Sequence, residues 1–165
     1  MWDRLLLAID QTDSGQAALA LTLGTAAPGR VGVVVFHVRE RSHYLRIPPL
    51  ETMEEARAVA DEAVAALTAA GIDARAVVRS AEQHHVARLI VEEAAAWSCD
   101  AVVLGTTRLR GLHRIGGSGV RERLVRRSSL PVLLAPPALR CSTRLRTRGD
   151  RLDGEAPAAG LRRHR

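Results

Sequence analysis

Short apolar segments alternate with helix-like patterns over the first 136 residues, and this alternation most constrains the fold. The strand-like segments cover residues 4–9, 31–38, 73–79, 101–104 and 131–134. The helix-like patterns between them cover residues 13–27, 52–70, 86–97 and 120–125. Val31–Val38 is apolar on both faces, which is typical of a central parallel strand covered by helices on both sides. The sequence therefore predicts one doubly wound α/β domain with five parallel strands and right-handed crossovers.

Two of the helices have recognisable start signals. Asp13 and Gln16 have the spacing of a capping box, and so do Thr52 and Glu55. We expect the first two helices to begin at these positions.

The net charge of +6 is concentrated near the carboxyl end of the sequence. Residues 140–165 hold eight arginines against three acidic residues, a net charge of +5, and the preceding residues contribute only +1. The periodic patterns also stop after Pro136 and Pro137. We predict a domain over residues 1–138 and an Arg-rich, disordered tail over residues 139–165.

Several classes of protein are excluded by simple absences from the sequence. The chain contains no lysine, which a Walker A phosphate loop requires. No apolar run approaches the ~20 residues of a membrane span, and Asp3 with Arg4 opposes a signal peptide. A cytoplasmic location is expected, with Cys99 and Cys141 as reduced thiols.

Three polar segments are expected to meet at one edge of the sheet. Ligands of open α/β sheets bind beyond the carboxyl ends of the strands, where the winding direction reverses. Asp10, residues 37–41 and the loop 105–119 follow three of the predicted strands. The loop combines five glycines with threonine and serine hydroxyls, so its amides and hydroxyls suit a phosphate group. The alternatives are a flexible surface loop, and an Asp10 that only caps the next helix or pairs with an arginine.

Four stretches of the sequence carry a family resemblance. They read LLLAIDQTDSGQAAL at residues 5–19, VVVFHV at 33–38, CDAVVLG at 99–105 and VRERLVRRSSLPVLLAP at 120–136. Over residues 4–136 the chain resembles the universal stress protein family. The resemblance implies the strand order 3-2-1-4-5 and a stress-response sensor or regulator that binds ATP, or another adenine nucleotide, with Mg²⁺.

The resemblance also implies which residues bind that nucleotide. An Asp after the first strand would contact the adenosine, and the glycine-rich loop would hold the phosphates. In this sequence the candidate cofactor-binding residues are Asp10, Gly105, Thr106, Thr107, Arg108, Ser118, Gly119 and Val120.

The sequence departs from the nucleotide-binding pattern of the family at two places. Arg108 stands where the pattern has a second glycine, and Ser118-Gly119 reverses the order of the Gly-Ser pair. The alternative function is therefore a family member that binds no nucleotide and acts through protein contacts.

The resemblance further implies a homodimer that forms through the last strand. Pro131–Pro136 would be an apolar edge strand, and unpaired edges invite pairing with another chain. The alternative is a monomer in which Pro131 and Pro136 protect the edge of the sheet from pairing.

The Arg-rich tail offers a weaker alternative, nucleic-acid binding through phosphate contacts, but it contains no aromatic residue for base stacking.

Other reactive side chains lack the partner residues that catalysis or metal binding requires. His84 and His85 are adjacent and should point in different directions from a solvated helix start. Cys99 has no partner Cys or His at motif spacing, and no convincing serine-nucleophile elbow is present. The sequence supports no enzymatic turnover beyond weak ATPase activity.

Overall fold

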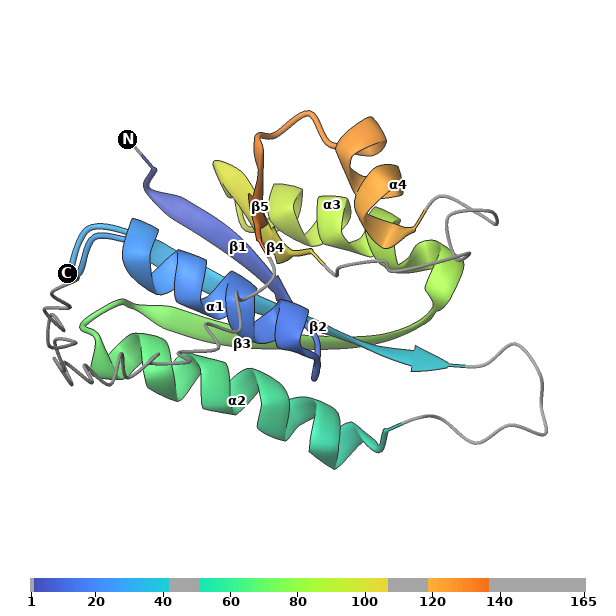
Figure 1. The fold of residues 1–165 in the computed structure, drawn as a ribbon, viewed down its shortest axis with the longest axis horizontal. Coiled ribbons are helices and arrows are strands. Elements are labelled where there is room, and N and C mark those ends of the chain that lie inside the picture. The colour runs from blue at the N-terminus through green and yellow to red at the C-terminus, as the bar shows by residue number, and fades with distance from the viewer. Residues whose placement is uncertain (1, 42–50, 107–118, 137–165) are drawn as a thin grey trace, which may run out of the picture.

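A five-stranded parallel sheet forms the centre of the computed structural model, which describes residues 2–41, 51–106 and 119–136 (Figure 1). The strands are β1 (Arg4–Ile9), β2 (Gly32–Arg41), β3 (Ala74–Glu82), β4 (Ala101–Gly105) and β5 (Val132–Ala135). Their order across the sheet is β3-β2-β1-β4-β5, and all four neighbouring pairs are parallel. The predicted fold class and strand order are confirmed.

Two helices cover each face of this sheet. The helices are α1 (Asp13–Thr25), α2 (Met53–Ala69), α3 (Val86–Ala96) and α4 (Val120–Arg127). The first two pack on one face and the last two on the other (Figure 1). In β1, Leu5 and Leu7 enter the core under α1 and α2, whereas Leu6 enters the opposite core. All three leucines are fully buried, which explains why the central strands lack polar alternation.

The order of the strands places the switch point between β1 and β4. The chain passes from β1 to β2 and β3, and then returns to pair β4 with the other edge of β1. The chain therefore continues from β1 toward one edge of the sheet through β2 and β3, and toward the other edge through β4 and β5. This divergence opens a crevice at the carboxyl ends of β1 and β4.

β2 and β3 continue beyond their predicted ends. Ladder pairing extends through Arg39 opposite Ser80 to Arg41 opposite Glu82. The added residues of β2 are charged, because only part of each side chain is covered there. The added residues of β3 are not less covered than the rest of that strand, and Ala81 among them is buried. In β2 the apolar pattern therefore ends where the burial of the strand decreases, whereas in β3 it ends where polar residues begin.

The predicted capping box at Asp13 is wrong, whereas that at Thr52 is confirmed. The N-cap of α1 is Thr12, which has an extended backbone and whose hydroxyl accepts the amide of Ser14. Asp13 already belongs to the first helical turn. Before α2, Thr52 and Glu55 exchange hydrogen bonds as the sequence predicts.

Some predictions concern residues that lie outside the described ranges. These are the tail over residues 139–165, Cys141, and the candidate ligands Thr107, Arg108 and Ser118. Within the described ranges, none of the helices has both the length and the hydrophobicity of a membrane-crossing segment.

Candidate functional site

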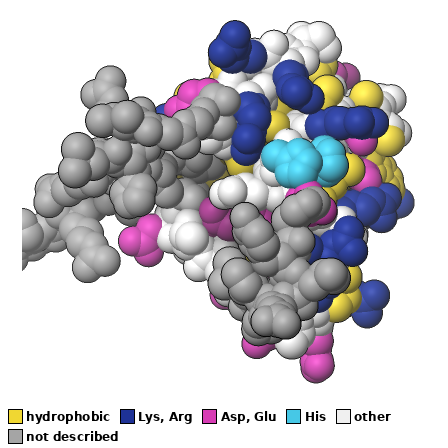
Figure 2. Space-filling view, turned by 90° about the vertical axis from the view of Figure 1, so that its right-hand side faces the viewer, with side chains coloured by type: hydrophobic (Ala, Val, Ile, Leu, Met, Phe, Trp, Pro, Cys, Tyr) yellow, Lys and Arg dark blue, Asp and Glu magenta, His cyan; other side chains and the backbone are white. Residues whose placement is uncertain are grey.

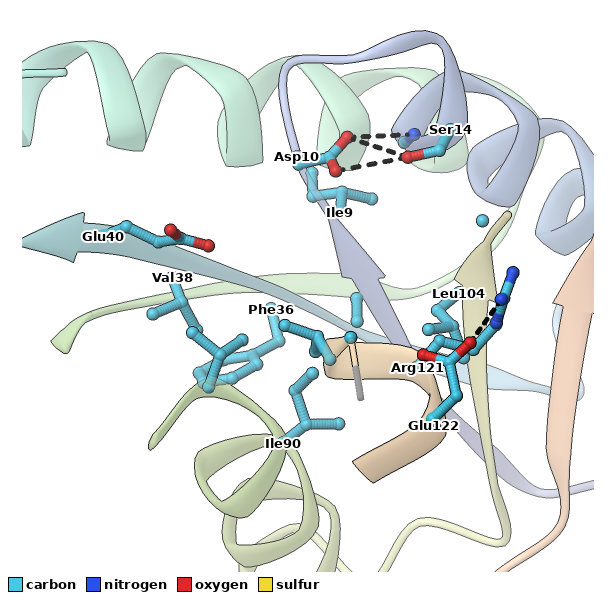
Figure 3. Close-up of a pocket in the computed structure, with 16 residues that line it drawn as sticks. Ile9, Asp10, Ser14, Phe36, Val38, Glu40, Ile90, Leu104, Arg121 and Glu122 are labelled. Carbon is cyan, nitrogen blue, oxygen red and sulfur yellow. Dashed lines mark hydrogen bonds and ion pairs between the residues drawn. The ribbon is translucent and has the colours of Figure 1, made fainter. Parts of the chain in front are cut away.

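A cavity of about 290 Å³ lies at the switch point, on the side of the sheet that α3 and α4 cover (Figure 3). Its lining is contributed by β1, β2, β4 and three helices: Ala8, Ile9, Asp10, Ser14, Gly15, Phe36, Val38, Glu40, Val86, Ile90, Leu104, Gly105, Gly119, Val120, Arg121 and Glu122. Figure 3 shows Asp10 beside Ser14 on one side of the cavity and Arg121 beside Glu122 on another. The cavity thus combines an apolar wall with a charged rim.

The structure brings four of the eight candidate ligands to this cavity. Asp10, Gly105, Gly119 and Val120 line it. Thr106 does not, because its hydroxyl and its amide both donate to the carbonyl of Ala135 in β5 at 2.9 Å. The remaining three candidates lie outside the described ranges.

The Asp10 carboxylate is held in place by the start of α1. Its Oδ1 accepts hydrogen bonds from the amide of Thr12 (3.0 Å), the hydroxyl of Thr12 (2.6 Å) and the amide of Gly15 (3.1 Å). Its Oδ2 accepts from the Ser14 hydroxyl at 3.2 Å. Since each carboxylate oxygen has two lone pairs, Oδ2 retains acceptor capacity for a ligand. Asp10 therefore accepts a free amide at the start of α1 alongside the N-cap Thr12, which agrees in part with one sequence-based alternative, and it also lines the cavity.

Gly105 and Gly15 are required by close approach of the backbone. A methyl group on Gly105 would overlap the backbone of Ser14, and one on Gly15 would overlap the carbonyl of Asp10. A larger residue at either position would force α1 away from the ends of β1 and β4. Gly105 thus shapes the cavity by allowing α1 to pack against the end of β4.

Glu40 is an acidic rim residue in an unfavourable setting for its charge. Burial raises the pKa of this carboxyl above its usual range, and the negative charges of Asp10 and Glu51 act in the same direction. The positive charges of Arg123 and His37 partly offset the rise in pKa. In Figure 3 the Glu40 side chain lies above Val38, at the β2 end of the cavity.

His37 lies beside the cavity rather than in its lining, and its ring is almost completely buried. Its Nδ1 is 3.0 Å from the carbonyl oxygen of Ile9, which accepts only, so Nδ1 carries a proton. Its Nε2 is 2.7 Å from a carboxylate oxygen of Glu51. The other Glu51 oxygen accepts from Gln11 at 2.6 Å. This network ties the ends of β1 and β2 to the segment before α2, so His37 has a structural role.

The start of α4 forms the opposite side of the cavity. Gly119 is the N-cap, and Glu122 occupies the third helical position, from which a side chain can reach back to the cap. A hydrogen bond from Arg121 lowers the pKa of Glu122, and its own amide and that of Gly119 act in the same direction. Arg121 also forms an ion pair with Glu122.

Sequence reasoning did not identify Glu40 and Glu122 as rim residues, nor α3 as a wall. Glu40 falls within the segment 37–41 that was expected at the edge, but its role depends on the length of β2. Val86 and Ile90 lie on the apolar face of α3, within the helix predicted over residues 86–97. A periodic pattern does not separate residues that line a cavity from residues that fill a core. For Glu122, the spacing Gly119-x-x-Glu122 was an available signal.

Comparison with known proteins now identifies the family. The model of the universal stress protein family matches residues 1–136. The chain belongs to the universal stress protein family. A comparison with curated protein sequences finds no match.

Solved structures of other universal stress proteins have the same fold. One from Burkholderia pseudomallei is 26% identical with a TM-score of 0.63, covering 82% of this chain and 96% of that chain. A universal stress protein in complex with cAMP is 21% identical with a TM-score of 0.61, covering 83% and 98%. A universal stress protein from Archaeoglobus fulgidus in complex with dAMP is 20% identical with a TM-score of 0.57, covering 81% and 97%.

Proposed function

We propose that this universal stress protein binds an adenine nucleotide in the switch-point cavity and acts as a cytoplasmic sensor or regulator of the stress response. The observation that carries the proposal is the convergence of Asp10, Gly105, Gly119 and Val120 on one cavity. The structures of family relatives with cAMP and with dAMP support the same ligand class.

The two ends of the cavity suit different parts of a nucleotide. Phe36, Val38 and Ile90 offer an apolar wall for a planar base. Beside it, the Oδ2 atom of Asp10 has acceptor capacity for a ribose hydroxyl.

The opposite end of the cavity suits the phosphates. There, the amide of Val120 at the positive end of α4 and the guanidinium of Arg121 attract anions. Mg²⁺ would enter with a triphosphate and would offset part of its negative charge.

Calorimetric titration tests the proposal with ATP and Mg²⁺ and, separately, with AMP. We expect a dissociation constant in the micromolar range. Asp10→Asn is the most informative variant, because an amide oxygen can still accept the hydrogen bonds of Thr12 and Gly15. Since a hydrogen bond to a charged group contributes about 1.5–3 kcal/mol, the variant should weaken binding by roughly 10- to 100-fold.

The matched control is Asp13→Asn, which lies in the first turn of the same helix but does not line the cavity. This variant should bind like the wild type. Absence of binding heat for both nucleotides, with no nucleotide released when the purified protein is denatured, would refute the proposal. A role through protein contacts alone would then be favoured.

We propose further that the protein forms a homodimer in which the two copies pair through β5. This strand has a neighbour only on its β4 side within the described part of the sheet. Leu134, at its centre, is 42% exposed, which is unusual for a large apolar residue in a strand. A second copy pairing along β5 would cover this side chain.

A further inference from the structure

The turn between β3 and α3 brings two histidines and a glutamate together at the surface. β3 ends at Glu82, and a single 3₁₀ turn over Gln83–His85 leads into α3. The rings of His84 and His85 do not diverge as the sequence suggested, because neither residue lies in a regular α-helix. Their centroids are 4.0 Å apart with the planes tilted by 42°. The histidines form one contiguous patch at the surface in Figure 2.

The three side chains have the spacing of metal ligands. One ligand atom from each of Glu82, His84 and His85 lies within 4.8 Å of the other two. The Nδ1 atom of His84 is 3.4 Å from a carboxylate oxygen of Glu82. Two ligands about 2.0–2.1 Å from one zinc ion in tetrahedral geometry are about 3.4 Å apart. The His84–Glu82 distance therefore already fits, and only His85 needs to turn toward the pair.

Such a turn costs little, because the histidines are exposed. The His84 side chain is 60% exposed and that of Glu82 is 30% exposed, and His85 is also exposed. Exposed side chains change rotamer without disturbing a packed core. The remaining coordination positions would face water, as in a site with three protein ligands.

Neighbouring arginines do not prevent cation binding at this position. Arg79 donates to Glu93 at 2.8 Å, and Arg88 donates to Glu92 at 2.6 Å. Each of these guanidiniums is thus paired with a carboxylate that offsets its charge. Arg123 donates to the backbone carbonyl of Gln83 at 3.4 Å, which attaches α4 to the turn without engaging a ligand atom.

We propose that Glu82, His84 and His85 form a binding site for a divalent transition-metal ion of the zinc class. Two imidazole nitrogens and one carboxylate oxygen match the donors that Zn²⁺ prefers in proteins. The proposal does not depend on nucleotide binding, because none of the three residues lines the switch-point cavity.

Calorimetric titration with Zn²⁺ tests the site on full-length protein that carries no polyhistidine tag. The titration is run at about pH 7.5, because metals bind the neutral form of imidazole. We expect the wild type to bind one more Zn²⁺ per chain than His84→Gln or His85→Gln. Removal of a direct ligand should weaken this binding event at least as much as loss of a group that hydrogen-bonds a ligand, which costs about 10- to 100-fold in affinity.

Gln83→Ala is the matched control, since it alters the same turn and removes no ligand. It should retain the full Zn²⁺ stoichiometry of the wild type. Histidine variants that bind Zn²⁺ as tightly and in the same amount as the wild type would overturn the proposal.

A second measurement on the unmodified protein removes any dependence on how the variants fold. In amide NMR spectra, Zn²⁺ should shift the signals of residues 82–86, and a chelator should reverse the shifts. Zn²⁺-induced shifts that spare these residues would overturn the proposal as well.

Discussion

Where the end of β4 passes under the start of α1, Gly105 and Ser14 are in direct backbone contact, and this contact explains the glycine. Gly105→Ala should destabilise the protein by about 1–3 kcal/mol, because a methyl group against rigid backbone forces the elements apart. Urea unfolding monitored by circular dichroism measures the change. A loss below about 1 kcal/mol would show that α1 moves away easily and that the contact does not fix the cavity.

Gly24 provides the control for this substitution. It lies in α1, and a Cβ added there would meet no atom within 4 Å. Gly24→Ala should be neutral or stabilise the protein by up to about 1 kcal/mol, because alanine favours the helical backbone. The opposite signs of the two substitutions would separate steric overlap from backbone entropy.

Cys99 is a second residue whose chemistry depends on its surroundings. It is a free, buried cysteine, and burial raises the pKa of its thiol to about 11. In a Cys141→Ser background, Cys99 should react with a thiol reagent at about pH 8 roughly 100-fold more slowly in the native protein than in urea, because the thiolate is the reactive form. Equal rates in both states would contradict the buried, protonated thiol.

At the scale of elements, Asp100 joins the beginnings of β1 and β4. Its carboxylate accepts the amides of Asp3 at 2.7 Å and Arg4 at 2.8 Å. The hydrogen bond from Arg4, followed by that from Asp3, lowers the pKa of Asp100 below its usual range. A carboxyl with a lowered folded pKa stabilises the fold above its unfolded value of about 4, and the contribution is lost as the pH falls through the lowered value.

Asp100→Asn should therefore reduce the urea midpoint at about pH 7 and cause a smaller reduction below about pH 3. Asp61→Asn, on the exposed side of α2, should leave the midpoint unchanged at both pH values. The same reduction for Asp100→Asn at neutral and acidic pH would contradict the role assigned to its charge.

The elements also show what the sequence could and could not predict. Apolar runs located the central strands because burial on both faces leaves a strong signal, as in Val33–Phe36. The edge strands β3 and β5 were also located, although they are only partly buried. Strand ends were missed where Arg39 and Glu40 continue the ladder beyond the covered region. The α1 cap was misplaced by one residue, because Thr12 and Asp13 are both good capping residues. Only the backbone conformation decides between them.

The candidate site could be predicted as far as its position in the fold. Chain order and the switch-point rule place Asp10 and Gly105 at one edge. The direction of individual side chains was not predictable: Thr106 turns away to β5, and Glu40 turns toward the cavity. The direction of a side chain at a strand end depends on the neighbouring strand, and the local sequence does not identify that neighbour.

At the scale of the whole molecule, the outer edge of β5 pairs with no other strand that the structure describes, and the proposed homodimer rests on this edge. If two copies pair along this strand, Leu134→Asp should convert the dimer to a monomer at micromolar concentration, because the interface would bury an unpaired charge. Val125→Asp is the control, since this residue is 51% exposed on α4 rather than on β5. Sedimentation velocity gives the masses. A wild type that stays monomeric, or a Leu134→Asp variant that stays dimeric, would contradict pairing through β5.

Nucleotide binding at the switch point is tested most directly by locating AMP on the protein by amide NMR. A second cavity of about 340 Å³ at the amino-terminal ends of the strands, lined by Gly32 and Val33, serves as an internal control. We predict that AMP shifts the amides of Val38, Gly105 and Val120 and leaves those of Gly32 and Val33 unchanged. Shifts centred on the second cavity, or no shifts at millimolar AMP, would contradict a nucleotide site at the switch point.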